Sequence, residues 1–342
     1  MTQETPVESE DRPMMRAVVI DRTGGPDVLV VREAPIPEPG PGEVRIRVEA
    51  AGVNFADIMT RAGRYLVQPE LPFVPGVETA GTVDAVGDGV AHLREGDRVC
   101  ATHSGGGYAE YAIAREGAVI ALGERLDLAT AAGLPVAGMT AYHLAHTVAS
   151  PPGGGTAVVY AAAGGVGSLL VQLLRRSGAR VIGLVGDDEK AAFARGLGAD
   201  DIVVYSRESI PERVLELTGE RGADVIYNCV GERTLEGDFA AIATFGTIVM
   251  YGQAAGPPSP KGLYVALMRA FMKSPALRLY HLFSSMNAAR AAHEAGAERM
   301  VDWLASGELH MPIHRVYELD ETAMAHADIE ARRTRGKVLI AT

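Results

Sequence analysis

One stretch of the chain constrains its fold more than any other, because an apolar run there ends in small residues and then becomes helical: Thr156-Ala-Val-Val-Tyr-Ala-Ala-Ala-Gly-Gly-Val-Gly167. Residues 156–161 predict a buried strand, and the glycines that follow allow backbone conformations and close approaches that a Cβ would block. Apolar residues then recur at helical spacing, at Val166, Leu169, Leu170, Leu173 and Leu174. A strand, a glycine turn and a helix N-terminus in this order are typical of a site for the pyrophosphate of a dinucleotide.

The composition describes an acidic chain of 342 residues with a formal net charge of −11. An acidic surface repels nucleic acid and anionic membranes, so we expect neither as a partner. Met1–Pro13 lack the basic start and apolar core of a signal peptide, and no later run is apolar enough to span a bilayer. We therefore expect a cytoplasmic protein with a flexible tail at 1–13. Cys100 and Cys229 lie far apart in apolar segments, which predicts buried, reduced thiols.

The two halves of the chain differ in their hydrophobic rhythm. Glu43–Glu49 alternates polar and apolar residues, which predicts a strand with Val44, Ile46 and Val48 facing a core. In the second half, apolar strands alternate with helical patterns, which predicts an α/β fold with a doubly wound parallel sheet covered on both faces. We expect strands at 156–161, 180–185, 202–205, 223–230, 246–251 and 277–280, with helices at 189–197, 235–243 and 287–305 and another that begins at Ser209-Ile-Pro211. A last strand at 336–340 is expected to return to the first half.

Several short motifs follow one another along nearly the whole chain after the tail. They are Ala50-Ala-Gly-Val-Asn-Phe-Ala-Asp57, Arg61-Ala-Gly-Arg-Tyr65, Leu71-Pro-Phe-Val-Pro-Gly-Val-Glu78, Gly107-Tyr-Ala-Glu-Tyr111, Gly138-Met-Thr-Ala141, the turn at 162–167 and Gly336-Lys-Val-Leu339. Together they resemble the medium-chain dehydrogenase/reductase superfamily, and within it the zinc-free quinone oxidoreductase branch that includes zeta-crystallin. The resemblance implies a GroES-like β-rich catalytic domain, formed by 14–138 and 278–342, and a Rossmann domain at 139–277. It also implies a reaction in the cleft and a homodimer joined through the Rossmann sheet.

A catalytic zinc ion is the first chemical question that the resemblance raises. Where the alcohol dehydrogenase branch carries its zinc ligands, this chain has Asn54, Val77 and Val136. Its two cysteines cannot build that branch's separate four-cysteine zinc site. We therefore expect no metal.

The histidines offer no alternative metal site. Pro312 opposes a helix that would bring His310 and His314 together, and no third ligand is evident near His143 and His146. We interpret these histidines as hydrogen-bonded or surface residues.

The resemblance places Asn54, Tyr65 and Thr140 around the nicotinamide and the substrate as catalytic candidates. Asn54 offers an amide hydrogen bond to a carbonyl oxygen, and Tyr65 offers a phenol that orients the substrate or delivers a proton. Other roles stay open: a turn-stabilising side chain for Asn54, a rim position for Tyr65 and a helix cap for Thr140. Glu78, an acid within an apolar motif, is expected to be a structural carboxylate.

The end of the second Rossmann strand indicates which cofactor binds. NAD-preferring sites commonly carry an acidic residue there, whereas this chain has Val185 followed by Gly186. Removing a carboxylate makes room for the 2′-phosphate of NADPH. Asp187 and Asp188 would repel this phosphate if they pointed inward, but we expect them to start the next helix.

The expected cofactor is therefore NADPH. The resemblance matches Lys190, Tyr205 and Arg332 to residues that hold the 2′-phosphate, and two cations with a phenol suit that role. The remaining expected cofactor-binding residues are Ala162, which replaces the usual first glycine, Gly164, Gly165, Val166, Gly167, Gly186, Val230, Tyr251 and Gln253.

These expectations combine into an NADPH-dependent reductase of quinones or related conjugated carbonyls, which passes hydride to a small electrophilic acceptor without a metal. Quinone oxygens can take protons from solvent. A 2-enoyl thioester or alkenal reductase is the alternative, and it would need Tyr65 as the acid for the α-carbon. An NADPH-binding protein with a structural or sensory role is the alternative of another class. The apolar residues Met268, Phe271, Met272, Phe283 and Met286 suit a substrate pocket, the core or a subunit interface.

Overall fold

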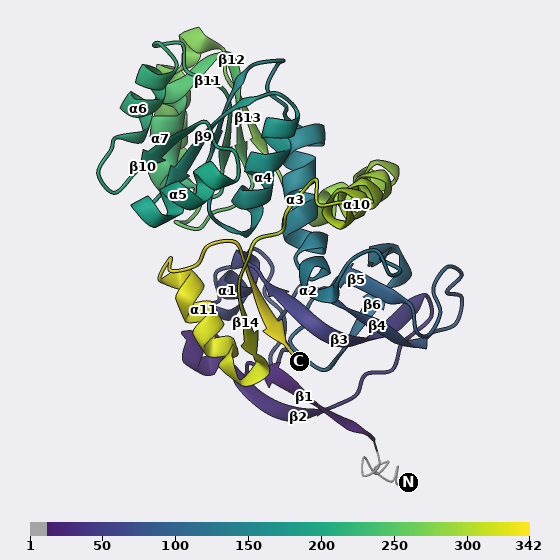
Figure 1. The fold of residues 1–342 in the computed structure, drawn as a ribbon. Coiled ribbons are helices and arrows are strands. Elements are labelled where there is room, and N and C mark those ends of the chain that lie inside the picture. The colour runs from purple at the N-terminus through teal and green to yellow at the C-terminus, as the bar shows by residue number, and fades with distance from the viewer. Residues whose placement is uncertain (1–11) are drawn as a thin grey trace.

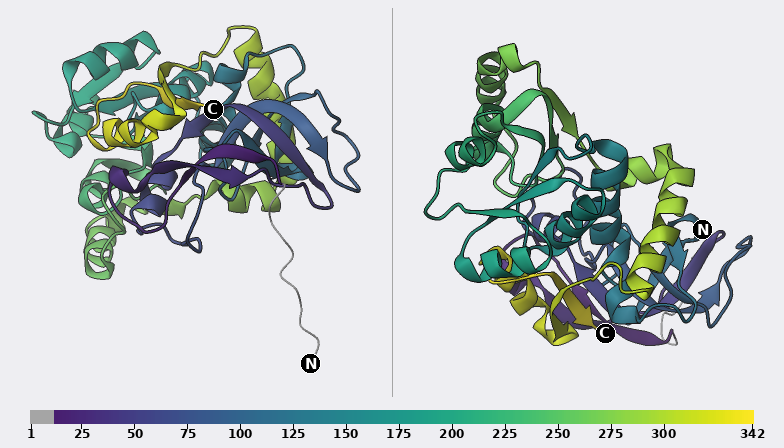
Figure 2. Two further views of the ribbon diagram at one scale, coloured as in Figure 1. Left: turned by 90° about the horizontal axis from the view of Figure 1, so that it is seen from below. Right: turned by 45° about the horizontal axis from the view of Figure 1, so that its top comes forward.

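The computed structural model describes residues 12–342, so residues 1–11 of the expected flexible tail lie outside the described part of the chain. Two sheets, each with its own helices, form the upper and lower parts of the molecule in Figure 1. The two views of Figure 2 show that strands from both ends of the described chain lie together in one of these parts. Within residues 12–342, no helix has the length and apolar character needed to cross a membrane.

The middle of the chain forms a six-stranded parallel sheet with the order β10-β9-β8-β11-β12-β13. The first strand in sequence lies in the centre, which is the doubly wound order of a Rossmann domain. Ala157 and Val159 pack into one apolar cluster and Val158 and Tyr160 into another, so both faces of the sheet are buried, as predicted. The strands are β8 (Thr156–Val159), β9 (Arg180–Val185), β10 (Asp201–Val204), β11 (Ala223–Asn228), β12 (Ile242–Met250) and β13 (Ala276–Leu279).

Helices cover both faces of this sheet. On one face lie α3 (Met139–His143), α4 (Gly165–Arg176) and α5 (Asp188–Gly196), and on the other lie α6 (Ile210–Leu217), α7 (Glu232–Ala241) and α8 (Pro260–Arg269). α4 buries the predicted stripe of Leu169, Leu170, Leu173 and Leu174. It ends at Arg176, just before Gly178, whose φ of 82° is the left-handed conformation that commonly follows a helix.

The second sheet contains strands from both ends of the chain. Its path is β14-β15-β3-β4-β5-β7, with β6 paired to β3, and a hairpin of β1 and β2 lies outside it. β15 pairs with β3, which confirms that the C-terminal strand returns to the first half. The predicted alternation in β3 is also confirmed, since Val44, Ile46 and Val48 are buried. The strands are β1 (Met14–Val19), β2 (Val30–Pro35), β3 (Glu43–Val53), β4 (Glu78–Val86), β5 (Arg98–Thr102), β6 (Tyr111–Arg115), β7 (Val119–Ala121), β14 (Ile313–Glu318) and β15 (Lys337–Ala341).

A helical connection joins the two parts of the molecule. α3 is flanked by π-helical segments at Leu134–Gly138 and Leu144–Val148, and it packs against α10 (Arg290–Ala305). The other helices beside the second sheet are α1 (Phe55–Arg61), α2 (Leu128–Ala131) and α11 (Thr322–Glu330).

Two expectations about the C-terminal third need correction. The helix expected at 287–305 is two helices, α9 (Leu282–Ala288) and α10, because Ala289 leaves the helical region with φ −133° and ψ 48°. The domain boundary expected at residue 277 falls inside β13, so the parallel sheet continues to Leu279.

Candidate active site

The turn between β8 and α4 has the form expected of a dinucleotide site. A Cβ at Gly167 would lie 2.1 Å from the carbonyl oxygen of Ala161, so only glycine fits this close approach, as predicted. The unusual backbone conformation was expected at the glycines of this turn, which is wrong. The left-handed residue is Ala161, with φ 48°. Gly164 is the extended N-cap of α4, and the first amide groups of that helix face the turn.

The end of β9 brings the predicted phosphate-binding residues together. Val185 is buried and no acid follows it directly, while the Tyr205 hydroxyl lies close to Gly186: a Cβ there would be 3.1 Å from it. The Lys190 ammonium donates a hydrogen bond to the main-chain carbonyl of Arg332. Lys190 therefore contacts the Arg332 backbone, and the Tyr205 phenol lies at Gly186.

The two acids beside this cluster start the next helix, as expected, and both are paired with cations. Asp187 is the N-cap of α5: its carboxylate accepts the Lys190 backbone N–H at 2.8 Å and lies 3.7 Å from the Lys190 ammonium. Asp188 accepts two hydrogen bonds from the Arg207 guanidinium, at 2.8 and 2.6 Å. The repulsion that these acids could exert on a phosphate is thus largely balanced by local partners.

The remaining predicted cofactor contacts lie at the carboxyl ends of β11 and β12. Val230 donates its N–H to the Asn228 side-chain oxygen at 2.7 Å, and Tyr251 donates its N–H to the Asn228 carbonyl at 2.9 Å. Gln253 follows two residues later on the same loop. In an open parallel sheet this edge, beside the central strand, is where a ligand binds.

Asn54, the first catalytic candidate, belongs to a buried ionic network. Its Nδ2 donates to Glu78 Oε1 at 2.8 Å, and its Oδ1 accepts from Lys337 Nζ at 2.9 Å. Lys337 also forms an ion pair of 2.5 Å with Glu78, and both side chains are almost fully buried. The second carboxylate oxygen of Glu78 accepts the Val136 N–H at 2.7 Å. Glu78 is therefore a structural carboxylate, as predicted.

Lys337 is the residue that sequence reasoning missed. Its ammonium also donates to the Val53 carbonyl at 2.8 Å, and Gly336, just before it, donates its N–H to the Ala163 carbonyl at 2.7 Å. One short segment thus connects the dinucleotide turn to Asn54. The available signals were the Gly336-Lys motif and the acid of the Glu78 motif, but nothing in the sequence pairs them.

α1 adds a second buried acid to this region. The Asp57 carboxylate accepts the Asn54 backbone N–H at 2.8 Å and completes a capping box at the start of the helix. Burial raises the pKa of Asp57 to about 6, although the hydrogen bond from Asn54 and the charge of Lys337 oppose the shift. The turn-stabilising role left open for Asn54 is therefore present, alongside its contacts with Glu78 and Lys337.

Tyr65 and Thr140 lie apart from this network. The Tyr65 hydroxyl is 3.5 Å from Nε2 of His281, and burial together with the Asp57 charge raises the pKa of the phenol. Thr140 is buried as the second residue of α3, within a continuous helical stretch whose N-cap is Gly138. The capping role considered for Thr140 is therefore wrong.

The site has no evident metal ligands. Among residues 12–342, no three His, Cys, Asp or Glu side chains gather in a way that could hold a metal ion. His143 Nε2 lies 3.0 Å from His293 Nδ1, and its other ring nitrogen lies 3.2 Å from the Thr147 hydroxyl, so it is a hydrogen-bonded histidine as predicted. His314 lies on a strand rather than on a helix.

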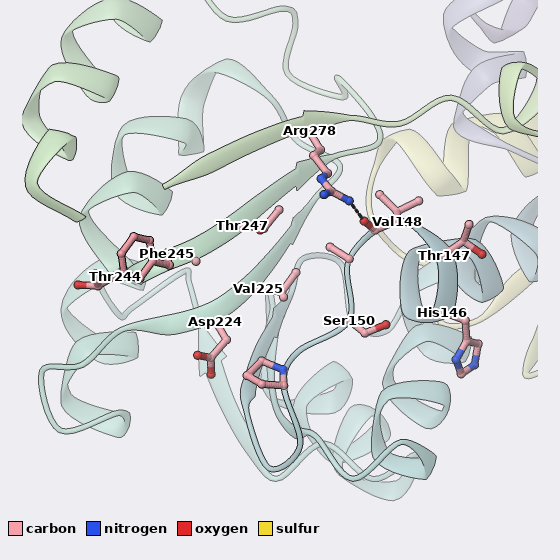
Figure 3. Close-up of a pocket in the computed structure, with 13 residues that line it drawn as sticks. His146, Thr147, Val148, Ser150, Asp224, Val225, Thr244, Phe245, Thr247 and Arg278 are labelled. Carbon is pink, nitrogen blue, oxygen red and sulfur yellow. Dashed lines mark hydrogen bonds between the residues drawn. The ribbon is translucent and has the colours of Figure 1, made fainter. Parts of the chain in front are cut away.

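A cavity of about 520 Å³ lies elsewhere on the Rossmann domain, as Figure 3 shows. Its lining includes Asp224 and Val225 at the start of β11, whereas the predicted cofactor contacts follow the end of that strand. Arg278 reaches across it and donates a hydrogen bond to the Val148 carbonyl. This hollow is therefore separate from the candidate site.

Comparison with known proteins matches both parts of the molecule. Residues 40–124 match the alcohol dehydrogenase GroES-like domain, and residues 165–306 match the zinc-binding dehydrogenase domain. The chain is 36% identical over 335 residues to a 2-haloacrylate reductase of Burkholderia sp, which covers 96% of this chain and 99% of that protein.

Two quinone oxidoreductases are similar over the same length. That of Pseudomonas aeruginosa is 34% identical over 330 residues, covering 96% of this chain and 99% of that protein. The crystal structure of Escherichia coli quinone oxidoreductase complexed with NADPH has a TM-score of 0.91 at 29% identity, covering 96% of this chain and 100% of that one. The chain therefore belongs to the zinc-free quinone oxidoreductase branch of the medium-chain dehydrogenase/reductases.

Proposed function

We propose that this protein is an NADPH-dependent reductase of quinones or related conjugated carbonyls that works by hydride transfer without a metal. One observation carries the proposal. A dinucleotide turn, with Lys190 beyond the end of the next strand, is joined through Gly336 and Lys337 to the half-buried Asn54, and residues 12–342 contain no cluster of metal ligands.

The residues present fit NADPH. The close packing of Gly167 on the Ala161 carbonyl brings the N-terminus of α4 to the end of β8, where its free amides suit a pyrophosphate, and Lys190, Tyr205 and Arg332 supply donors for a 2′-phosphate. When bound, NADPH supplies a hydride from its nicotinamide ring. The relative complexed with NADPH supports this choice.

Asn54 is suited to orient the carbonyl oxygen of the acceptor. One of its amide hydrogens is held by Glu78, but the other faces the Gly52 carbonyl at 3.4 Å, which is a weak hydrogen bond. An acceptor oxygen in the direction of that hydrogen can replace the weak bond at little cost. The Lys337 ammonium, held at the amide oxygen, polarises Asn54 and strengthens it as a donor.

The acceptor class follows from what the site can stabilise. An amide donor at Asn54 favours negative charge on an oxygen, which develops when a quinone or a conjugated carbonyl accepts hydride. Two relatives are named for reducing such electron-poor molecules, a quinone and a 2-haloacrylate.

A substrate panel tests this proposal. NADPH oxidation is measured with 1,4-benzoquinone, an enal, an enoyl thioester and a simple aldehyde, and NADPH binding is measured in parallel by nicotinamide fluorescence. We expect turnover of the conjugated acceptors and none of the simple aldehyde. Tight NADPH binding with no turnover of any acceptor would instead support a structural or sensory role and would contradict the proposal.

We also propose the division and assembly that the resemblance implies. With the boundary moved to the end of β13, residues 14–138 and 280–342 would form the catalytic domain and 139–279 the Rossmann domain, with the acceptor bound between them. The cytoplasmic location stays a prediction.

The proposed homodimer would form through β13, an edge strand of the parallel sheet. Leu279 on this strand is 71% exposed and Met272 beside it is 87% exposed. An unpaired edge flanked by exposed apolar side chains favours pairing with a second copy. Met268 and Phe271 are exposed as well, which supports the interface, among the three places expected for them, over the core.

Light scattering after size exclusion measures this assembly. We expect about twice the mass of the 36.0 kDa chain and expect Leu279→Arg to produce monomers. Val316→Arg is the matched control, because Val316 is a half-exposed residue on β14, the edge strand of the other sheet. A monomeric parent chain would contradict the proposed dimer.

A further inference from the structure

Two side chains from distant parts of the chain meet at the mouth of the candidate site. The Tyr65 hydroxyl lies 3.5 Å from Nε2 of His281, and Nδ1 of His281 lies 3.0 Å from the Ser284 hydroxyl. Tyr65 and His281 are 216 residues apart in sequence. The three groups form a chain of hydrogen-bonding atoms, of which only Tyr65 was expected to take part in catalysis.

His281, the middle residue of these three, lies at the ligand-binding edge of the Rossmann sheet. His281 comes two residues after the end of β13, and the intervening Tyr280 donates its N–H to the Met250 carbonyl at the end of β12. The carboxyl ends of these parallel strands are the ligand-binding edge. Tyr65 follows α1, the helix that Asn54 caps, so the pair spans from one side of the cleft to the other.

The contacts of His281 accommodate an arrangement of its protons that suits a relay. A neutral imidazole has one donor and one acceptor nitrogen, and the Ser284 hydroxyl can donate to Nδ1. Nε2 then carries its hydrogen toward the Tyr65 oxygen, which leaves the phenol's own hydrogen free to point into the cleft. His281 and Ser284 are exposed on their other sides, so water can reach the Ser284 hydroxyl.

We propose that Tyr65, His281 and Ser284 form a proton relay that serves protonation of carbon, and that conjugated carbonyls with a C=C bond are therefore substrates of this site. The inference rests on the proposed function for its supply of hydride. Tyr65 acts as the acid, while His281 and Ser284 act through it and are positioning residues.

The relay balances as follows for an α,β-unsaturated carbonyl. Hydride bonds to the β-carbon, the C=C electron pair moves toward the carbonyl, and an enolate results. The α-carbon of the enolate takes the Tyr65 proton, and the electron pair of the broken O–H bond stays on the phenolate. Nε2 of His281 then gives its proton to the phenolate while Nδ1 takes the Ser284 proton. Water protonates the Ser284 oxygen and leaves as hydroxide, and proton exchange with solvent returns the imidazole to its starting tautomer.

The same relay is dispensable for a quinone, because its reduced oxygens take protons from solvent without help. This difference between acceptors separates a relay from a structural contact.

The resting distance of 3.5 Å between the Tyr65 hydroxyl and His281 Nε2 is long for proton transfer, and such contacts commonly shorten when substrate binds. Asp57 is the charged group that acts on Tyr65, and it raises the pKa of the phenol, whereas His281 is faced by Tyr65, Ser284 and the Phe283 ring.

The test compares two substitutions of His281 with two acceptors. His281→Leu removes the contact, and His281→Gln keeps a donor for Tyr65 but cannot relay a proton. We expect both to lower kcat for an enal by about 100-fold, the scale of general acid catalysis, and to change kcat for 1,4-benzoquinone by less than about twofold. Equal losses with both acceptors, or rescue of enal turnover by His281→Gln, would overturn the relay.

Two further measurements keep the test decisive. His310→Asn alters an exposed histidine away from the cleft and is expected to change neither rate. In cofactor-free protein labelled with ¹⁵N-histidine, Tyr65→Phe should change the Nε2 chemical shift of His281, and an unchanged shift would refute the contact itself. Failure of the parent chain to reduce any acceptor would refute the proposed function instead, and the NMR comparison would still decide whether Tyr65 and His281 interact.

Discussion

The two sides of the cleft are built by different physical means. On the Rossmann side, the turn after β8 depends on backbone geometry, with a close approach at Gly167 and the amides of α4. On the opposite side, Asn54, Glu78 and Lys337 depend on buried charge, and the Lys337–Asn54 contact joins residues 283 positions apart. The first side needs small residues in a local order. The second needs long-range contacts in which every buried charge has a partner.

This difference teaches where the molecule is fragile. A backbone-built turn tolerates changes that keep its small residues, whereas a buried ion pair fails when either partner is removed, since the remaining charge has no water around it. The catalytic side should therefore respond more strongly to single substitutions and to pH than the cofactor side.

The largest expected effect comes from breaking the buried pair. Lys337→Met leaves Glu78 charged and buried, and we expect the free energy of unfolding to fall by about 3–5 kcal/mol. Urea titration followed by circular dichroism measures it. The double substitution Glu78→Gln with Lys337→Met should be more stable than Lys337→Met alone.

The matched control for this prediction is an exposed ion pair. Arg290 and Glu294 form a contact of 2.7 Å on the surface of α10, and Arg290→Met should leave the urea midpoint unchanged. A Lys337→Met protein as stable as the parent would show that the buried pair does not hold this side of the cleft.

The buried pair of His143 and His293 predicts a loss of stability in acid. Burial and the neighbouring His143 lower the pKa of His293 to about 4, from an ordinary value of 6.5. The unfolded chain therefore takes up a proton first, and the stabilisation is complete above pH 6.5 and lost as pH falls toward 4. The shift corresponds to roughly 3 kcal/mol.

Unfolding measured between pH 7 and pH 4 checks this dependence against two variants. His293→Leu should flatten the pH profile, whereas His310→Leu, at an exposed histidine, should keep the slope of the parent chain. Parallel profiles for the parent and His293→Leu would count against a titrating His143–His293 pair.

The backbone-built side gives a smaller effect. In Gly167→Ala, the added Cβ would lie 2.1 Å from the Ala161 carbonyl oxygen, so the turn must shift, at a cost of roughly 1–3 kcal/mol and with weaker NADPH binding. Gly196→Ala is the control, because no atom lies within 4 Å of its added Cβ in α5. Unchanged NADPH affinity in Gly167→Ala, by fluorescence titration, would show that this turn does not bind the pyrophosphate.

The smallest expected effect distinguishes the two cofactors. Lys190→Met removes one cation from the proposed phosphate site, and we expect NADPH affinity to fall about tenfold, or ~1.4 kcal/mol, with NADH affinity unchanged. Lys261→Met, an exposed lysine at the start of α8, should alter neither. Equal losses for both cofactors would place Lys190 outside the 2′-phosphate site.

The sequence predicted the cofactor side well because its signals are local. β9 spans Arg180–Val185 as expected, and Asp187 caps the next helix as expected. The phosphate residues Lys190 and Arg332 came from the family resemblance, and the structure brings them into contact.

The catalytic side was predicted only in part, because hydrophobic periodicity does not indicate which distant residues are in contact. Glu78 was expected to be structural, but its partner Lys337 was not identified. Thr140 was considered as a cap because the sequence does not reveal that a π-helical segment continues into α3. The contact of Tyr65 with His281 likewise had no signal in the chain.

The central claim is that this cleft transfers hydride from NADPH without a metal. One measurement tests it most directly: kcat/KM for NADPH and for NADH with 1,4-benzoquinone, on protein dialysed against a chelator and shown by mass spectrometry to be metal-free. We expect full activity and a preference for NADPH of at least about tenfold, as a charge-assisted phosphate site implies. A preference for NADH, or activity that returns only when zinc is added, would contradict the account.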